Sequence, residues 1–372
     1  SSSCSRSCTC CGSAARRADA PVRRWFSVGE LAGVHHPAVT LLRDLEKLAD
    51  AGDFSGVLAV SRDGNRLVEL ARGFADRANG RPNTLATPFG IASAAKGLTA
   101  LTVASLIQSG ELSGDTTLRS LIPDALPLVD PAVTIEHLLG HTSGVGDYLD
   151  EDELDDVDDY VMGLPVHRLA APADYLPLLD GHPQRASPGS GFTYNNGGFV
   201  MLSIAVEVAS GRSFYDLVQE RVLDPAGMVD TGFPRSDRLP AGAAIGYLAD
   251  GRSNVLHLPV RGAGDGGAYS TLSDLEALWQ SLFAGRILPL PAVERLVAPR
   301  SVLPDGRHRY GLGFWLRPDR ETVMLEGLDA GVSCRTVYDR PSGLSYTVIS
   351  NTSSGAWPLV AYLDERLPVL AG

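Results

Sequence analysis

The sequence predicts a mixed α/β (α+β) protein whose antiparallel sheet is built from both chain ends, with an inserted, mainly helical domain. Strand-like segments lie at 55–72 and again beyond residue 310, and helical stretches fill the interval between them. Strands at both ends with helices between imply one sheet assembled from distant parts of the chain. With 372 residues and 44% hydrophobic content, the chain can bury a sizeable core, which excludes disorder throughout.

The first predicted elements are a helix and a hairpin. Apolar residues recur at three-residue spacing from Val39 to Leu48, which predicts an amphipathic helix that ends near Gly52. Residues 55–72 then hold two apolar runs separated by the turn sequence DGN at 63–65. This pattern predicts two antiparallel neighbouring strands.

The later elements are predicted in the same way from periodicity and turn residues. Helices are expected at 98–110, 134–144, 198–211, 214–223, 271–285 and 355–370, and strands at 310–318, 321–327, 333–341 and 343–351. We expect a leader over 1–24, a sheet domain over 25–92 plus 262–372, and a mainly helical domain over 93–261. The active site would lie between the last two.

The amino-acid composition limits the kinds of partner that the protein is expected to bind. Forty-four acidic residues against 32 basic ones give a net charge of −12, which argues against nucleic acid or an anionic membrane surface. No apolar run reaches the roughly 18 residues of a membrane span. Arg23 and Arg24 resemble an export signal only faintly, because Glu30 and two histidines occupy the expected apolar region. We expect a cytoplasmic protein.

Four cysteines, Cys4, Cys8, Cys10 and Cys11, crowd the leader, and Cys334 stands alone far downstream. Such a cluster could bind a soft metal, but no histidine or further cysteine lies close in sequence. We therefore expect a disordered leader or a mis-assigned start, and no metal site or cofactor.

The segment 147–159 carries nine carboxylates. A calcium loop would need glycine at its sixth position and a closing glutamate, and both are missing. A solvated acidic loop or helix start is favoured.

The sharpest chemical feature is Ser93-x-x-Lys96. Among 32 basic residues only Lys47 and Lys96 are lysines, and arginine cannot be deprotonated in a protein. If a helix begins near Ser93, one turn brings the hydroxyl and the amine into contact range, and a desolvated neutral lysine can activate the serine. The alternative is an ordinary exposed helix lysine, as Lys47 is expected to be, but small apolar neighbours of Lys96 indicate burial.

Tyr194 and Asn196 form a second feature, on a glycine-rich segment just before a predicted helix. In the functional interpretation Tyr194 relays protons and the Asn196 amide holds Lys96 or a substrate carbonyl. The alternative is a turn with one aromatic side chain filling a gap.

Together the two motifs resemble the serine beta-lactamase and penicillin-binding-protein superfamily, most closely its branch of class C beta-lactamases, D-aminopeptidases and related esterases. The resemblance runs over residues 38–365 and includes IEHLLGHTSGV at 135–145, ASPGSGFTYNN at 186–196, GGAYSTLSDL at 266–275, YGLGFWL at 310–316 and GVSCRTVYD at 331–339. It implies a beta-lactamase-like fold.

The resemblance also implies roles. Ser93 would be the nucleophile, Lys96 its activating base, Tyr194 the general base or acid, and Asn196 a positioning residue. The oxyanion hole would combine the Ser93 backbone N–H with one near Leu328.

The family's third motif, Lys-Thr-Gly or His-x-Gly, falls on Leu325-Glu326-Gly327. Gly327 is kept and allows close backbone approach to a substrate. The cation that helps to bind a substrate carboxylate is missing. Glu326 and Asp329 would repel an anion if they point inward, and the alternative is that both face solvent.

The remaining motifs give weaker evidence for a function. GAGDGG at 262–267 satisfies GxGxxG, but no βαβ unit surrounds it. His137 and His141 are spaced like metal ligands, yet a single pair in an apolar helix is more often a hydrogen-bonded structural element. Neither GxSxG nor HExxH occurs.

The sequence therefore predicts a serine hydrolase that acts through an acyl-enzyme on a small-molecule ester, amide or peptide, with weak or absent beta-lactamase activity. Two alternatives remain: a transacylase of a small-molecule pathway, and a catalytically silent binding protein on the same fold. The oligomeric state stays open.

Overall fold

The computed structural model describes residues 37–151, 154–303, 306, 308–318 and 320–371. The predictions about the leader, its cysteine cluster and Arg23-Arg24 lie outside the described residues, as do two carboxylates of the acidic segment, Asp152 and Glu153.

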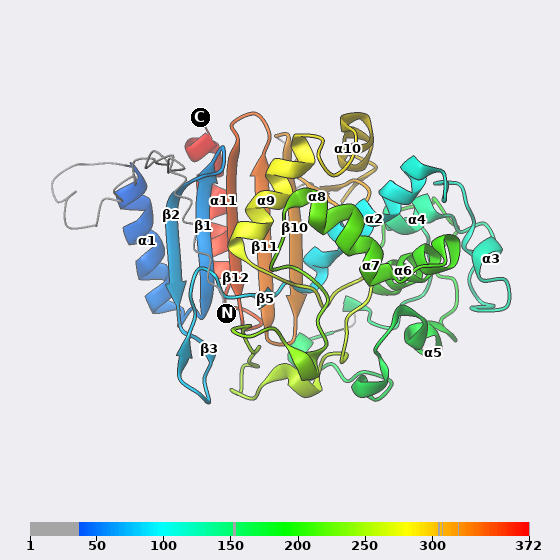
Figure 1. The fold of residues 1–372 in the computed structure, drawn as a ribbon, viewed down its shortest axis with the longest axis horizontal. Helices are drawn as coiled ribbons and strands as arrows, with labels where there is room; N and C mark the ends of the chain where they lie inside the picture. Colours follow the sequence, from blue (N-terminus) through cyan, green and yellow to red (C-terminus); the bar gives the residue numbers. More distant parts are fainter. Residues whose placement is uncertain (1–36, 152–153, 304–305, 307, 319, 372) are drawn as a thin grey trace, which may run out of the picture.

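An antiparallel sheet forms the centre of the fold (Figure 1). Its strand order is β2-β1-β12-β11-β10-β9-β8-β7. The strands are β1 (Gly56–Arg62), β2 (Asn65–Arg72), β7 (Ser301–Val302), β8 (Arg309–Tyr310), β9 (Trp315–Leu316), β10 (Thr322–Asp329), β11 (Val332–Asp339) and β12 (Leu344–Ser350). Because β1 pairs directly with β12, from Gly56 opposite Ser350 to Arg62 opposite Leu344, the prediction of one sheet assembled from both chain ends is confirmed.

The hairpin between β1 and β2 closes through two residues in the left-handed region. Asp63 has φ 51° and Gly64 has φ 75°, the conformation that a two-residue hairpin loop requires. Aspartate and glycine tolerate it best, which explains why this turn could be predicted from sequence.

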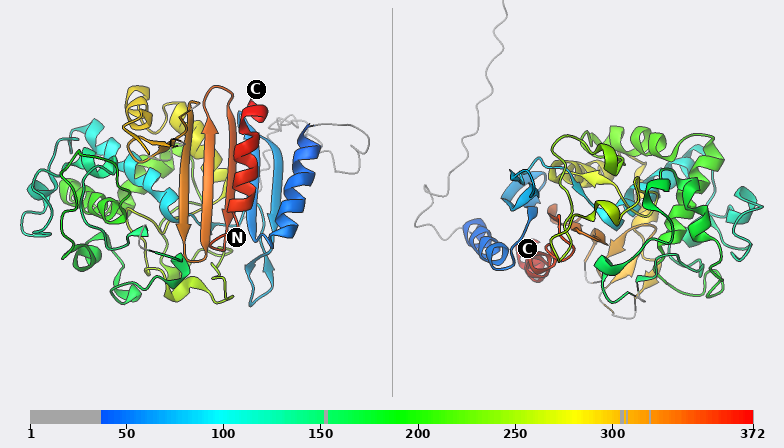
Figure 2. Two further views of the ribbon diagram at one scale, coloured as in Figure 1. Left: turned by 180° about the vertical axis from the view of Figure 1, so that it is seen from behind. Right: turned by 90° about the horizontal axis from the view of Figure 1, so that it is seen from below.

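Helices cover both faces of the sheet. On one face lie α1 (Pro37–Ala51) and α11 (Trp357–Ala371), which Figure 2 shows from behind. Leu45 and Leu363 of these helices pack in one core cluster with Tyr346 of β12. On the other face α9 (Leu272–Phe283) and the helical part build a larger core around Trp279.

The helical part is arranged around two buried helices, α2 (Lys96–Ser109) and α6 (Asn196–Ser210). Each ends at a glycine in the left-handed region, Gly110 and Gly211, as helix C-termini commonly do. The other helices are α3 (Leu118–Leu121), α4 (Ile135–Leu139), α5 (Leu176–Leu179), α7 (Phe214–Val218), α8 (Asp224–Ala226) and α10 (Leu290–Val297). Within the described ranges no helix is long and apolar enough to cross a bilayer.

Two expectations about helices need correction. The helix predicted at 134–144 stops at Leu139, because His141 adopts the left-handed conformation (φ 53°). Ser93 does not open the α-helix itself: it lies on a 3₁₀ turn, Ala92–Ala95, and α2 begins at Lys96. The division into domains at residues 93 and 261 stays a prediction.

Two short pairings escape sequence analysis. In the first, β5 (Phe89–Gly90) pairs with β6 (Tyr269–Ser270); in the second, β3 (Phe74–Asp76) pairs with β4 (Arg81–Pro82). The β5–β6 pairing matters for the site, because it holds the glycine-rich loop 262–267 beside the turn that carries Ser93.

We predict that Leu45→Ala lowers the free energy of unfolding by about 2–5 kcal/mol, because Leu45 is fully buried between α1 and the sheet. Lys47→Ala on the same helix is the control: Lys47 is exposed, as expected, and its loss should change stability by less than about 0.5 kcal/mol. Urea unfolding checks both. Equal midpoints for the two variants would contradict this account of the α1 packing.

Candidate active site

The Lys96 amine lies at the centre of the site. Its side chain is buried, with 2% of its surface exposed. Nζ lies 2.8 Å from Ser93 Oγ, 2.7 Å from Asn196 Oδ1 and 2.9 Å from the Asp265 carbonyl oxygen. The structure therefore brings together three of the residues that the sequence singled out, Ser93, Lys96 and Asn196, and adds a backbone carbonyl from the glycine-rich loop.

Each partner comes from a different element. Ser93 lies one turn before Lys96, and Asn196 is the first residue of α6. The glycine-rich loop approaches both helices closely. A Cβ on Gly264 would lie 2.1 Å from the Phe199 carbonyl oxygen, and Thr99 Oγ1 donates to the Gly264 carbonyl at 2.7 Å. The glycines of the GxGxxG match therefore allow close helix packing.

In this geometry a neutral Lys96 amine is able to accept a proton. The Asn196 amide oxygen and the Asp265 carbonyl can only accept hydrogen bonds, so they take the two N–H groups of a neutral amine. Its lone pair is then left for the Ser93 hydroxyl. Burial lowers the pKa of Lys96, although carboxylates led by Asp265 and Glu151 partly oppose that effect.

The backbone around Ser93 is unusual. Ala92 has a positive φ of 44°, a conformation that costs energy for a residue with a Cβ. Strand β10 passes directly against this turn: a Cβ on Gly327 would lie 2.1 Å from the Ile91 carbonyl oxygen and 2.9 Å from the Ser93 nitrogen. Only glycine fits at 327, which places the backbone of β10 beside the Ser93 amide.

Tyr194 lies on the other side of the serine. Tyr194 and Ser93 line the same cavity, and the Lys96 amine lies 4.9 Å from the Tyr194 ring centroid. The ring packs between His141 (centroids 4.4 Å apart) and Trp315 (5.9 Å, stacked). Burial raises the pKa of Tyr194 well above its usual value, so the phenol is protonated in the free protein.

His141 supports Tyr194 from behind. Its Nδ1 accepts a hydrogen bond from the Asn195 N–H at 3.1 Å, and Nε2 is buried with no hydrogen-bond partner among the described residues. Burial holds the pKa of His141 well below its usual value, so the ring is neutral. His137 instead caps α4 with Thr134. No cluster of three metal-ligating side chains occurs within the described residues.

The third-motif residues divide between core and cleft. Leu325 is buried against Gly97 of α2, where a Cβ would meet its methyl groups at 2.7 Å. Glu326 forms an ion pair with Arg335, which also pairs with Asp364 at 2.7 Å. Among the described residues that line this cleft wall, Arg335 is the one arginine, and it is already paired with two carboxylates.

The expectation that segment 147–159 is a solvated loop is wrong at its beginning. Asp147 is buried and accepts hydrogen bonds from the backbone N–H of Asn196 (2.5 Å) and Gly197 (2.8 Å) at the start of α6. Burial raises the pKa of Asp147 to about 6. Glu151 Oε1 accepts from Asn196 Nδ2 at 3.0 Å, whereas Asp155 is exposed.

Sequence reasoning missed the supporting role of these acids. Asp147 and Glu151 orient Asn196, and the Asp265 carboxylate accepts from the Tyr148 hydroxyl at 2.6 Å. Nothing in the acidic run distinguishes Asp147 from its eight carboxylate neighbours, because its partners lie about 50 residues away.

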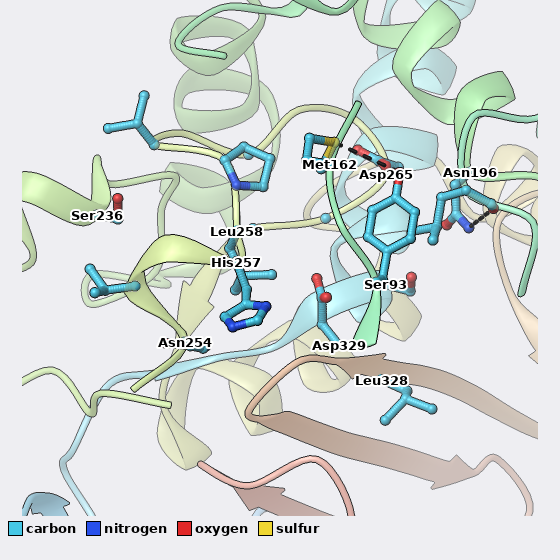
Figure 3. Close-up of a pocket in the computed structure, with 18 of the residues that line it drawn as sticks. Ser93, Met162, Asn196, Ser236, Asn254, His257, Leu258, Asp265, Leu328 and Asp329 are labelled. Carbon is cyan, nitrogen blue, oxygen red and sulfur yellow. Dashed lines mark hydrogen bonds between the residues drawn. The ribbon is translucent and has the colours of Figure 1, made fainter. Parts of the chain in front are cut away.

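Two cavities meet at Ser93. One, of about 240 Å³, is lined by Ser93, Asn196, Asp265 and Asp329 among others (Figure 3). The other, of about 760 Å³, is more open and is lined by Ser93, Tyr194, Trp315, Glu326 and Arg335 among others. Leu328 borders both. The serine can therefore contact the two halves of a substrate at the same time.

Comparison with known proteins finds relatives named as a D-aminopeptidase and an esterase. The chain is 30% identical over 305 residues to a D-aminopeptidase of Brucella anthropi, which covers 81% of this chain and 56% of that protein. It is 34% identical over 206 residues to esterase EstB of Burkholderia gladioli, which covers 51% of this chain and 49% of that protein. The chain thus spans about half the length of these two curated relatives.

The solved structure of a penicillin binding protein from Bacillus halodurans superposes with a TM-score of 0.80 at 36% identity, covering 86% of this chain and 99% of that one. A family model described as Beta-lactamase matches residues 41–367. That match takes in the sheet strands from both ends, the Ser93 turn, α6 and β10, and with it the chain belongs to the Beta-lactamase family.

Proposed function

We propose that this protein is a serine hydrolase that acts on an ester or amide through an acyl-enzyme on Ser93. The observation that carries the proposal is the buried Lys96 amine 2.8 Å from Ser93 Oγ, with Asn196 Oδ1 and the Asp265 carbonyl accepting its two N–H groups. Such an amine can remove the serine proton as the hydroxyl attacks a carbonyl carbon.

In the acylation step the Ser93 oxygen bonds to the carbonyl carbon and its proton passes to Lys96, which becomes an ammonium. Tyr194, which is protonated and lines the same cavity as Ser93, donates its proton to the leaving group. The bond to the leaving group breaks, and a phenolate remains beside the new ammonium, whose charge stabilises it.

In the deacylation step the Tyr194 phenolate takes a proton from water, and the hydroxide so formed attacks the acyl carbon. The bond to Ser93 breaks, and Lys96 returns its proton to the serine oxygen. Both residues end in their starting protonation states, so the cycle balances.

The developing oxyanion would be stabilised by the Ser93 backbone N–H and one from β10 near Leu328. The close passage of Gly327 past the Ser93 nitrogen supports this placement. Loss of one such donor typically raises the barrier by about 3 kcal/mol.

The names of the relatives support hydrolysis of esters or of amides, since one is an esterase and one a D-aminopeptidase. A transacylase remains the second candidate, because the open 760 Å³ cavity on the Tyr194 side could admit an acceptor amine in place of water. Product analysis with added amines separates the two. The contacts of the buried Lys96 amine with Ser93 and with the Tyr194 ring argue against a silent binding protein.

We predict that a fluorophosphonate probe labels the wild-type protein on Ser93. Ser93→Ala should abolish labelling and lower kcat/KM for p-nitrophenyl esters by at least about a thousandfold, because the acyl acceptor is gone. Mass spectrometry of the labelled peptide identifies the site. If the probe labels another residue, or if the variant keeps its ester activity, the proposal is wrong.

We predict that Lys96→Arg lowers kcat/KM for a neutral ester by about 10²–10⁴-fold, because arginine keeps its charge and cannot accept the serine proton. Lys47→Arg, at the other lysine, is the matched control and should retain wild-type activity.

The pH profile gives a second readout. A protonated Lys96 cannot act as base, so wild-type activity should rise with pH through the lysine's pKa, which burial places below the ordinary 10.5. This rise of activity with pH should be absent from the residual activity of Lys96→Arg. If the variant shows the same rise, another group is responsible for the titration.

We predict weak turnover of a chromogenic cephalosporin, at least about tenfold below that of a neutral ester in kcat/KM. The substrate's carboxylate lies on the side of the leaving nitrogen, so it would meet Glu326 and an Arg335 already paired with two acids, and position 325 holds leucine instead of lysine. Since screening weakens such repulsion, the deficit should shrink at high salt. Cephalosporin turnover equal to that of the ester would contradict this account of the cleft's charge.

A further inference from the structure

The two cavities at Ser93 differ in which half of a substrate they can take. Tyr194, the proposed donor to the leaving group, lines the 760 Å³ cavity but is not among the lining residues of the 240 Å³ cavity. The leaving group must lie within reach of that donor. On the proposed function, on which this inference rests, the acyl group therefore enters the 240 Å³ cavity.

The walls of this acyl cavity combine aromatic rings with carboxylates. Four tyrosines line it: Tyr148, Tyr160, Tyr175 and Tyr269. Three acids do as well: Glu151, Asp265 and Asp329. Neither lysine nor arginine is among the described residues that line it. Aromatic faces and carboxylates both attract an organic cation, and an aliphatic cation also gains from burial of its alkyl groups.

Asp329 is the acid best placed to meet such a cation. Its Oδ1 accepts the Ala330 N–H at 2.9 Å, and no ion pair among the described residues includes it. Figure 3 shows its carboxylate directed into the cavity between Ser93 and His257. Asp265, in contrast, is already bonded to the Tyr148 hydroxyl, and Glu151 to Asn196.

The position of Asp329 also fits the reaction. It closes β10 two residues after Gly327, the glycine that lies against the Ser93 nitrogen. A substrate whose carbonyl sits beside Ser93 would extend its acyl chain along this strand end toward the Asp329 carboxylate. The sequence left open whether Asp329 faces inward, and the structure shows that it does.

We propose that the acyl cavity binds acyl groups that end in an organic cation, a quaternary or primary ammonium, and that Asp329 is the residue that selects them. An uncharged acyl group of the same shape has the same apolar area. It lacks the attraction to the Asp329 carboxylate and the cation–π attraction to the tyrosine rings. An acyl group that ends in an anion would be rejected by the three carboxylates.

The test uses two p-nitrophenyl esters of equal shape. One carries the 4-(trimethylammonio)butanoyl group and the other the 5,5-dimethylhexanoyl group, in which carbon replaces the charged nitrogen. Wild-type protein should prefer the cationic ester by at least about tenfold in kcat/KM. Asp329→Asn, which keeps size and removes charge, should bring the ratio close to one.

Asp155→Asn is the matched control. Asp155 is an exposed acid in the 147–159 segment and is absent from the lining of both cavities, so its loss changes the net charge equally but not the cavity. The ratio should stay at the wild-type value. A ratio that falls equally in both variants would show that overall charge, and not Asp329, causes the preference.

The pH dependence of the ratio gives a further readout. Burial raises the pKa of Asp329 to about 7, so the carboxylate is largely neutral at pH 6 and charged at pH 8.5. The preference should grow between these values. Other titratable groups are near: Asp265, Glu151 and His257 line the cavity, and Lys96 lies behind Ser93. If their titration caused the increase in preference, the increase would persist in Asp329→Asn. The state of Lys96 itself cancels in the ratio.

The outcomes separate this inference from the proposed function. Ser93-dependent turnover of both esters with a ratio near one would overturn the cation preference and leave the hydrolase intact. If neither ester is turned over, calorimetry with Ser93→Ala still decides: tighter binding of the cationic ester, lost in the Ser93→Ala, Asp329→Asn double variant, supports the cavity's selectivity without hydrolysis. Equal binding of both esters overturns it.

Discussion

The site depends on one physical constraint, the burial of an amine. A lysine side chain removed from water is costly unless every polar atom finds a partner. Lys96 finds three, from residues 3, 100 and 169 positions away in the chain. The turn that carries Ser93, the start of α6 and the glycine-rich loop must therefore all be in place before the amine is satisfied, which couples the geometry around Ser93 to the assembly of the fold.

Burial, more than the surrounding charges, determines the protonation states of Lys96 and Tyr194. Desolvation lowers the pKa of Lys96 and raises that of Tyr194, so the two groups move toward a neutral base and a neutral acid. Nearby carboxylates oppose the first effect, but desolvation is the larger. Three of these acids, Asp265, Glu151 and Asp329, also line the 240 Å³ cavity, so their charges act both on Lys96 and on any group that enters that cavity.

Much of the fold could be predicted because its signals are local. Periodicity indicated α1, α2, α6, α9 and α11, and the DGN turn indicated the first hairpin, since each depends on neighbours within a few residues. Features that depend on distant partners could not be predicted from the sequence. Strands β5 and β6 are too short to show a pattern. Helix α4 ends early where His141 packs against the rings of Tyr194, Phe199 and Tyr310.

The candidate site divides along the same line. The sequence by itself determined that a lysine stands one turn after a serine in an arginine-rich chain, that Tyr194 and Asn196 precede a helix, and that the third motif lacks its cation. Only the tertiary structure decided that Asp147 is buried, that Arg335 is paired with Glu326 and Asp364, and that Asp329 faces the 240 Å³ cavity. The reason is physical: residue type and spacing are properties of the chain, whereas burial and charge pairing exist only once distant segments pack together.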